Sequence, residues 1–352
     1  MPAPLTYGDS GKVLSQGPVA PAYYFFGPVD VLKDEALAGL LDRVLDPSLR
    51  DFNYDQRSAT QLQPEDVESL CTTLPMMAER RVVVIRDVES WAKRARAKAA
   101  VLRYLDRPSA ETVLILVQGS ADPEADTDLL ARSTAVDFQP LTDTKAEKWV
   151  ARRAEQAGLT LEPTALRLLL TVTDGDLGWL AAELDKLAGL GGGQAVTVAQ
   201  VEGLLGVRHG ETPSDWRDAV LRHEPARALA MLPHVLEQAG VNGVKLAQML
   251  GTSLVGLGAM RALYDKGTKG RALAAAGFDV LKRTRANVGG PWGETVSLWT
   301  ATVSAWPRPR IQAALRATLA ADQSLKSTTI SDERGVLTDL VLAIAFAAQD
   351  AA

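Results

Sequence analysis

Phosphate-binding chemistry is the first possibility that residue types and spacing raise in this chain. A phosphate-binding loop needs a glycine-rich turn after a strand, then a lysine and a hydroxyl residue that open a helix. Gly27 and Lys33 stand in that order after an apolar stretch, but the second glycine is missing, Asp34 replaces the hydroxyl and Pro28 removes an amide. The sequence therefore disfavours a nucleotide site, and we expect Lys33 to be a solvated helix residue.

Two carboxylates follow the apolar run 82–85, where adjacent acidic residues would hold Mg²⁺ and orient water. Arg86 is inserted there, and Asp87 and Glu89 are not adjacent, so an ordinary strand-to-helix turn explains them better. No histidine stands in a plausible nucleophile context, and no Gly-x-Ser-x-Gly elbow occurs. We therefore expect no catalytic residue and no bound cofactor.

Large apolar residues stand in a short segment just before the same run. Leu74, Pro75, Met76 and Met77 lie between a helical pattern and the β-branched residues 82–85. Loops run over protein surfaces, so these side chains either fold back onto the core or bind a partner. Methionine suits a partner, because its flexible thioether adapts to an irregular apolar pocket.

One basic segment lies in the second half of the chain. Its cations are Lys266, Lys269, Arg271, Lys282, Arg283 and Arg285, and Trp292 and Trp299 follow. Cations interleaved with aromatic rings can follow a nucleic-acid backbone and stack on bases, which makes Lys282, Arg283, Arg285 and Trp292 candidates for DNA contact. A solvated helix face with tryptophans in the core explains the pattern equally well.

Composition limits the remaining classes of function. The 352 residues carry a net charge of −5, so no overall basic field draws the chain to nucleic acid or anionic lipid. Cys71 is the single cysteine, and with the three histidines it forms no metal-ligand spacing, so we expect neither a disulfide nor a metal site. No secretory signal and no apolar run near the roughly 20 residues of a membrane span is present. We expect a cytoplasmic protein.

The first part of the chain reads as an α/β domain. Residues 1–21 are rich in Gly, Pro and Ser, which predicts a loose leader, with Leu5 and Val13 as the positions that could pin it to the domain. Apolar runs then predict four strands, at 22–26, 82–85, 112–117 and 135–138, with helical patterns between them. Strands that alternate with helices indicate βαβ units, so residues 22–140 should form a mostly parallel sheet.

The strand signal ends after Pro140. Helical patterns follow at 144–157, 163–172, 176–187 and 197–205, where Thr197 and Gln200 form a capping box. Residues 141–210 should therefore be a small helical domain, and residues 211–352, again helical throughout, a larger one.

Four stretches in this order carry a family resemblance. They are the aromatic strand and Leu-rich helix from Tyr23, the segment from Leu70 to Arg86, the Gly-Asp-Leu and Glu-Leu-x-Lys-Leu pattern at 175–187, and the acidic-to-Leu-Lys motif at 321–326. Together they resemble the clamp-loader branch of the AAA+ proteins, and in detail the delta-subunit family of bacterial DNA polymerase III. Met77 stands where this family often has phenylalanine, which keeps apolar contact but loses an aromatic ring.

The resemblance implies a fold and a set of partners. The fold is an AAA+-like α/β domain with helices on both faces of a parallel sheet, then a small helical lid and a helical collar, both all-α. Leu74, Pro75, Met76 and Met77 would bind the ring-shaped sliding clamp (β) and help to open it for loading on primed DNA during replication. The γ/τ and δ′ subunits would complete a hetero-pentamer, with no membrane involved.

The resemblance also implies a division of labour. This chain would be a non-catalytic subunit of a DNA-directed DNA polymerase holoenzyme, while motor subunits hydrolyse ATP. The alternative is that the chain is itself a motor subunit or another AAA+ ATPase. The defective phosphate-binding loop argues against that alternative, as does the lack of clustered cysteines.

Overall fold

The chain forms two compact units in the computed structural model, residues 1–140 and 141–352. The structure describes residues 3–93, 95–119, 124–173, 175–189, 195–207, 210–238, 240–284, 288, 290–327 and 332–346.

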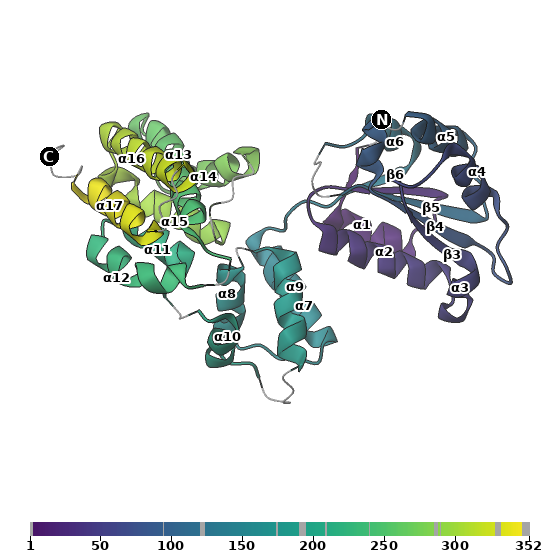
Figure 1. Cartoon of the computed structure of the whole chain (residues 1–352), viewed down its shortest axis with the longest axis horizontal. Coiled ribbons are helices and arrows are strands. Elements are labelled where there is room, and N and C mark those ends of the chain that lie inside the picture. The colour runs from purple at the N-terminus through teal and green to yellow at the C-terminus, as the bar shows by residue number, and fades with distance from the viewer. Residues whose placement is uncertain are drawn as a thin grey trace. The chain divides into compact units, whose positions relative to one another are not determined.

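Unit 1 is built on a parallel sheet, with six strands among its described residues in the order β1-β6-β2-β5-β4-β3 (Figure 1). The strands are β1 (Leu5–Thr6), β2 (Ala22–Phe26), β3 (Tyr54–Ser58), β4 (Arg81–Arg86), β5 (Thr112–Val117) and β6 (Thr134–Asp137). In the centre, Tyr24 pairs with Leu116 and Val83 with Leu114. The central strands β2, β4 and β5 are buried almost throughout, which explains their continuous apolar sequences.

Helices cover both faces of this sheet. One face carries α1 (Tyr7–Gln16) and α2 (Asp30–Val44), and the other carries α4 (Pro64–Thr72), α5 (Ala95–Asp106) and α6 (Thr127–Arg132), as Figure 1 shows. The second face packs as one cluster, in which Val67, Val101 and Leu129 of these helices meet alternate strand residues such as Tyr24 and Val83. The short elements η1 (Pro47–Leu49), α3 (Arg50–Asn53) and η2 (Val88–Lys93) join the larger ones. The expected α/β fold with a parallel sheet is confirmed.

The N-terminal segment differs from the prediction. A loose leader over residues 1–21 is wrong for residues 5–16, which form β1 and α1. Leu5 pairs with Val136 at the edge of the sheet, and Leu14 is buried. From α2, the Arg43 guanidinium donates to the carbonyl oxygens of Leu14 (2.8 Å) and Gly17. This long-range contact fixes a segment whose own composition favours disorder.

Unit 2 begins with four helices in its described part, at the places the sequence predicted. They are α7 (Asp143–Gln156), α8 (Pro163–Val172), α9 (Leu177–Gly189) and α10 (Val198–Leu205). The predicted capping box is present. The Thr197 amide donates to Gln200 Oε1 (2.9 Å), and the Gln200 amide donates to Thr197 Oγ1 (3.4 Å), so two amides at the start of α10 are satisfied.

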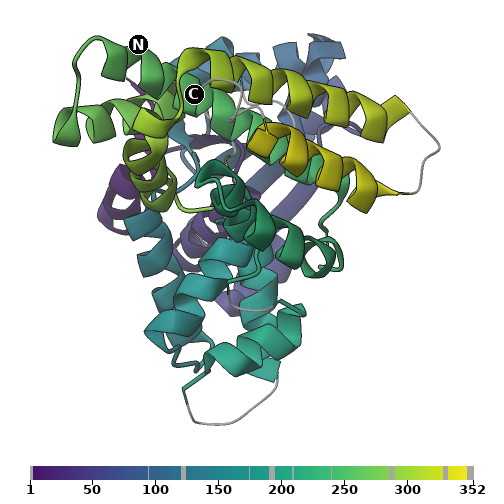
Figure 2. The same cartoon turned by 90° about the vertical axis from the view of Figure 1, so that its left-hand side faces the viewer.

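The rest of unit 2 is a larger helical core. Its elements are α11 (Pro213–Leu221), α12 (Pro225–Leu236), α13 (Gly243–Asp265), α14 (Gly270–Thr284), α15 (Trp292–Thr302), η3 (Val303–Ala305), α16 (Arg308–Ser327) and α17 (Glu333–Phe346). Figure 2 shows α16 and α17, the yellow end of the chain, side by side. An all-helical second part is thus confirmed, whereas its division into lid and collar near residue 210 stays a prediction.

Helix α13 is the centre of this core. It is long and apolar enough to cross a membrane by length and composition, but half of its most apolar stretch is buried inside the unit. It packs along α16, and Leu250, Leu254 and Leu257 are fully buried. A helix that is apolar on most sides is typical of the middle of a helical bundle.

A histidine is stacked at one edge of the core, between α11 and α12. The His223 ring lies 4.7 Å from the Trp306 ring, and Arg310 Nη2 donates to His223 Nδ1 (2.9 Å). Because a guanidinium can only donate, Nδ1 must be an unprotonated acceptor. Burial, and then the positive charge of Arg310, lower the pKa of His223 to about 4.

We predict that unit 2 loses stability as the pH falls from about 6.5 to 4. In that range the unfolded chain binds a proton at His223 and the folded chain does not, so the free energy of unfolding rises with pH. The ring is only partly buried, so we expect a contribution of about 1–2 kcal/mol rather than the full shift. Urea denaturation at several pH values measures it. His223→Asn suits the positive φ of 63° at this position and should flatten this part of the pH profile, and an unchanged slope would contradict the assignment.

Candidate functional site

The apolar loop between α4 and β4 points its side chains into solvent. Leu74 is 70% exposed, Met76 58% and Met77 91%. The loop is therefore not folded back onto the core of unit 1. Such a group of exposed apolar side chains is the usual mark of a surface that binds another molecule.

A buried asparagine holds the tip of this loop. Asn53, the last residue of α3, accepts at Oδ1 from the Met76 amide (2.6 Å) and donates from Nδ2 to the Met76 carbonyl oxygen (2.8 Å). The same Nδ2 donates to the Leu49 carbonyl oxygen (3.0 Å), and the Asn53 side chain is fully buried. Met77 follows in the left-handed region with φ of 57°, which turns the chain sharply at the point of greatest exposure.

The base of the loop is fixed by Arg81, the first residue of β4. Its side chain is buried, forms an ion pair with Asp55 of β3 and reaches the Thr73 carbonyl oxygen at 3.4 Å. Under the loop, the Cys71 carbonyl oxygen accepts from Thr112 Oγ1 (3.0 Å). Burial, opposed only in part by Arg81, raises the pKa of the Cys71 thiol to about 12, so this cysteine is a packing residue and not a nucleophile.

The chemistry available at this tip is apolar contact. The exposed side chains of Leu74, Met76 and Met77 contain no acid, base or nucleophile. Moving each of them from water into an apolar pocket would be favourable in free energy. The geometry thus suits binding to a protein surface rather than a reaction.

At the other candidate site, the prediction that Lys33 is a solvated helix residue is wrong. Lys33 is buried, with about 1% of its side chain exposed. Its ammonium donates to the carbonyl oxygens of Gly27 (2.9 Å) and Gln118 (2.6 Å) and pairs with Asp30 Oδ1 (2.7 Å). An ammonium has three N–H donors, and two backbone carbonyl oxygens together with the exposed Asp30 carboxylate account for all of them.

The neighbouring positions are occupied in the same way. Arg86, at the end of β4, pairs with Asp34 of α2 (Nη2 to Oδ1, 2.7 Å). The turn after β2 is closed by the Phe138 carbonyl oxygen, which accepts from the Val29 amide (3.3 Å). A Cβ on Gly27 would lie 2.7 Å from that oxygen, so the turn has no spare room. Positions that would contact phosphate and Mg²⁺ in a phosphate-binding site contact each other here.

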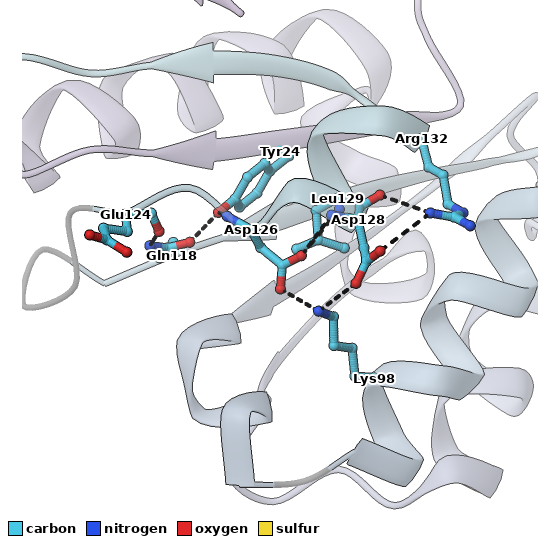
Figure 3. Close-up of polar contacts among 8 residues, drawn as sticks. All are labelled: Tyr24, Lys98, Gln118, Glu124, Asp126, Asp128, Leu129 and Arg132. Atoms are coloured by element: carbon cyan, nitrogen blue, oxygen red, sulfur yellow. Dashed lines mark hydrogen bonds and ion pairs between the residues drawn. The ribbon is translucent and has the colours of Figure 1, made fainter. Parts of the chain in front are cut away.

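Gln118, whose carbonyl oxygen binds Lys33, has a side chain held by further polar contacts (Figure 3). Its side chain accepts from the Tyr24 hydroxyl and donates to the Glu124 carbonyl oxygen (2.7 Å). The Tyr24 hydroxyl in turn accepts from the Asp126 amide (3.0 Å). Strand β2, the end of β5 and the start of α6 are thus joined through one tyrosine.

An ionic group continues this network on α5 and α6 (Figure 3). Lys98 pairs with Asp126 (2.7 Å) and Asp128 (2.8 Å), and Arg132 donates to the Asp128 carbonyl oxygen (3.2 Å). Burial alone would lower the pKa of Lys98, but the hydrogen bonds to the two aspartates outweigh it and raise that pKa. These contacts anchor α6, whose first turn Asp126 also caps.

Comparison with known proteins now adds to this geometry. Residues 23–136 match the family model described as DNA polymerase III, delta subunit, and this range contains both the apolar loop and the Lys33 cluster. Over this range the chain is similar to the DNA polymerase III delta subunit. It is 29% identical over 216 residues to DNA polymerase III subunit delta of Escherichia coli, an alignment that covers 56% of this chain and 61% of the E. coli protein. The resemblance inferred from the four sequence stretches is confirmed.

A solved structure agrees with this fold. The Bacillus subtilis DNA clamp loader delta protein superimposes with a TM-score of 0.59 and 16% identity, covering 97% of this chain and 99% of that one. At this identity the match supports the fold, an α/β unit followed by helices, and not the site.

The residues predicted for DNA contact are only partly brought together. Lys282 and Arg283 are exposed on the last turn of α14, where Arg283 Nε donates to the Asp279 carbonyl oxygen (3.3 Å). Trp292 is half-buried against the core of unit 2, and Arg285 lies outside the described residues. Contact with DNA at this surface stays a prediction.

Sequence reasoning missed two residues beside the apolar loop. Asn53 holds the loop, and its neighbour Phe52 is 62% exposed. An aromatic residue within the polar run 50–56 was a signal, but nothing local in the sequence connects it to residues more than twenty positions away.

We predict that Lys33→Met lowers the stability of unit 1 without changing its surface. The Gly27 and Gln118 carbonyl oxygens would each lose a buried donor, at a total cost of about 1–3 kcal/mol. Hydrogen exchange followed by mass spectrometry resolves the two units and should show faster exchange in β2 and α2. The control is Lys12→Met, which changes an exposed lysine of α1, and equal protection in both variants would contradict the structural role of Lys33.

Proposed function

We propose that this chain is the clamp-opening subunit of a DNA polymerase III clamp loader. In this role it binds the ring-shaped sliding clamp through the loop of Leu74, Pro75, Met76 and Met77, so that the clamp can be loaded on primed DNA. The observation that carries the proposal is the exposure of three large apolar side chains on a loop that Asn53 and Arg81 hold in place.

A held apolar tip favours tight binding for a physical reason. Each large side chain moved from water into an apolar pocket contributes about 1.5–3 kcal/mol, less the cost of ordering it. Here the backbone at Met76 is already fixed by two hydrogen bonds, so little backbone conformational entropy is lost on binding.

Opening of the ring follows from differential affinity. A ligand shifts a conformational equilibrium only as far as it binds one state better than the other. The tip would therefore open the clamp by fitting its pocket better when one interface of the ring is parted, and no energy source within this chain is required.

The nucleotide chemistry is assigned to other subunits. The three intramolecular acceptors of Lys33 and the Arg86–Asp34 pair support a chain that neither binds nor hydrolyses ATP. Motor subunits (γ/τ) would hydrolyse ATP, and with δ′ they would complete a hetero-pentamer in the cytoplasm. Contact with primed DNA within that assembly would include Lys282 and Arg283.

We predict that replacing Leu74, Met76 and Met77 together by serine abolishes tight binding to the sliding clamp. The summed loss of apolar contact corresponds to at least about a thousandfold rise in Kd. Biolayer interferometry with the purified clamp of the same organism measures it, and circular dichroism should show an intact fold, because changes at exposed loop positions rarely cost much stability.

A matched control exists in unit 2. Val255, Leu319 and Phe346 are 59%, 57% and 58% exposed, and their triple serine variant should bind the clamp as the unchanged chain does. Normal clamp binding by the loop variant would sink the proposal, and so would an equal loss in both variants. Unfolding of the loop variant would instead assign these side chains to the core.

We also predict that the isolated chain has no measurable affinity for ATP and Mg²⁺. The only lysine at the turn after β2 has its donors engaged inside the protein, and Asp34 would repel a triphosphate. Isothermal titration calorimetry tests this. Saturable ATP binding that disappears in Lys33→Met would contradict the prediction and revive a motor-subunit function.

A further inference from the structure

The exposed large apolar side chains of unit 1 gather at one place. Among the described residues of that unit they are Phe52, Leu74, Met76 and Met77. Leu74, Met76 and Met77 belong to the apolar loop, whereas Phe52 belongs to α3, a separate single turn of helix. A second segment therefore brings an apolar group to the same end of the unit.

Hydrogen bonds establish that the two segments are neighbours. Asn53 binds both the amide and the carbonyl oxygen of Met76, and Phe52 is adjacent to Asn53 in the chain, about 3.8 Å away between Cα atoms. Asn53 itself is buried, so α3 and the loop tip are packed together, and the side chain of the neighbouring residue in α3, Phe52, is 62% exposed.

The surroundings of Phe52 are polar. Asp51 is exposed beside it, and Arg50 forms an ion pair with Asp42 of α2. Glu79, two residues after Met77, is exposed as well. Exposed charges therefore flank both apolar segments in the chain, and protein–protein interfaces commonly combine an apolar centre with a polar rim.

We propose that Phe52 is a fourth apolar contact to the sliding clamp, and that Asn53 is the positioning residue that holds α3 and the loop as one surface. This inference rests on the proposed function. The occupant is an apolar patch of the clamp next to the pocket that receives the loop, because a pocket that covers Met76 must approach the segment whose asparagine grips Met76.

Phe52→Ser in the full-length chain tests the contact. Loss of one large apolar contact should raise the Kd for the purified clamp about 10- to 100-fold. Phe52→Leu keeps an apolar side chain and should restore most of the affinity. Phe346→Ser, at 58% exposure in unit 2, is the matched control and should leave the Kd unchanged.

The outcomes separate this inference from the proposed function. If the serine variant of Leu74, Met76 and Met77 loses the clamp while Phe52→Ser binds normally, Phe52 is no contact and only the inference is overturned. If the loop variant also binds normally, the proposed function itself fails. An equal loss in Phe346→Ser would overturn the inference too.

Asn53→Ala tests the positioning role through coupling. Without the side chain, α3 and the loop are no longer held together, so Phe52→Ser should cost less than about threefold in the Asn53→Ala background. A residue that only stabilises the fold would leave the cost of Phe52→Ser unchanged, and that result would overturn the positioning role. If Asn53→Ala does not fold, the comparison of Phe52→Ser with Phe52→Leu still decides the contact.

Discussion

A buried ammonium group ties together the part of unit 1 where strands β2 and β5 end. Lys33 of α2 reaches the carbonyl oxygens of Gly27 and Gln118, which directly follow those two strands. In open parallel sheets the crevice at the carboxyl ends of the strands is where ligands bind. Here the ammonium group of Lys33 lies at this edge and binds backbone carbonyl oxygens of the chain itself.

Charged and apolar side chains of unit 1 are placed differently. Charges in unit 1 are largely used within it, as in the pairs Arg86–Asp34 and Arg81–Asp55, while the exposed tip is apolar. The same parallel sheet carries both features, because β4 ends at Arg86 near the Lys33 cluster and begins at Arg81 under the loop. One strand thus runs from the Lys33 cluster to the base of the apolar loop.

The central elements were predictable from sequence because their signal is local. The continuous apolar runs of β2, β4 and β5 indicate strands buried on both faces, and the spacing of leucines indicates the helices. Strand β3 has the polar sequence Tyr-Asp-Gln-Arg-Ser and pairs only with β4, so neither an apolar run nor a clean alternation marked it.

The remaining differences come from contacts between distant residues. Composition alone made residues 5–16 look loose, but Arg43 and β6 hold them. Helical position made Lys33 look solvated, but one of its acceptors lies at Gln118, far along the chain. The sequence singled out the apolar loop and left open whether its side chains are exposed or folded back onto the core. The role of Asn53 could not be predicted, because its side chain bonds to the backbone of Met76, and a backbone contact requires no particular residue type at position 76.

Asn53 holds the tip of the apolar loop through the loop's backbone and not through its side chains. Within the loop, the carboxamide contacts only the backbone amide and carbonyl groups of residue 76, and every amino acid except proline has both groups. The side chains at positions 74 and 76 can therefore differ in size and shape while these hydrogen bonds are kept, whereas the left-handed backbone at Met77 disfavours β-branched residues there. Substitutions at positions 74 and 76 would then alter the apolar surface of the loop while the bonds that hold its backbone stay the same.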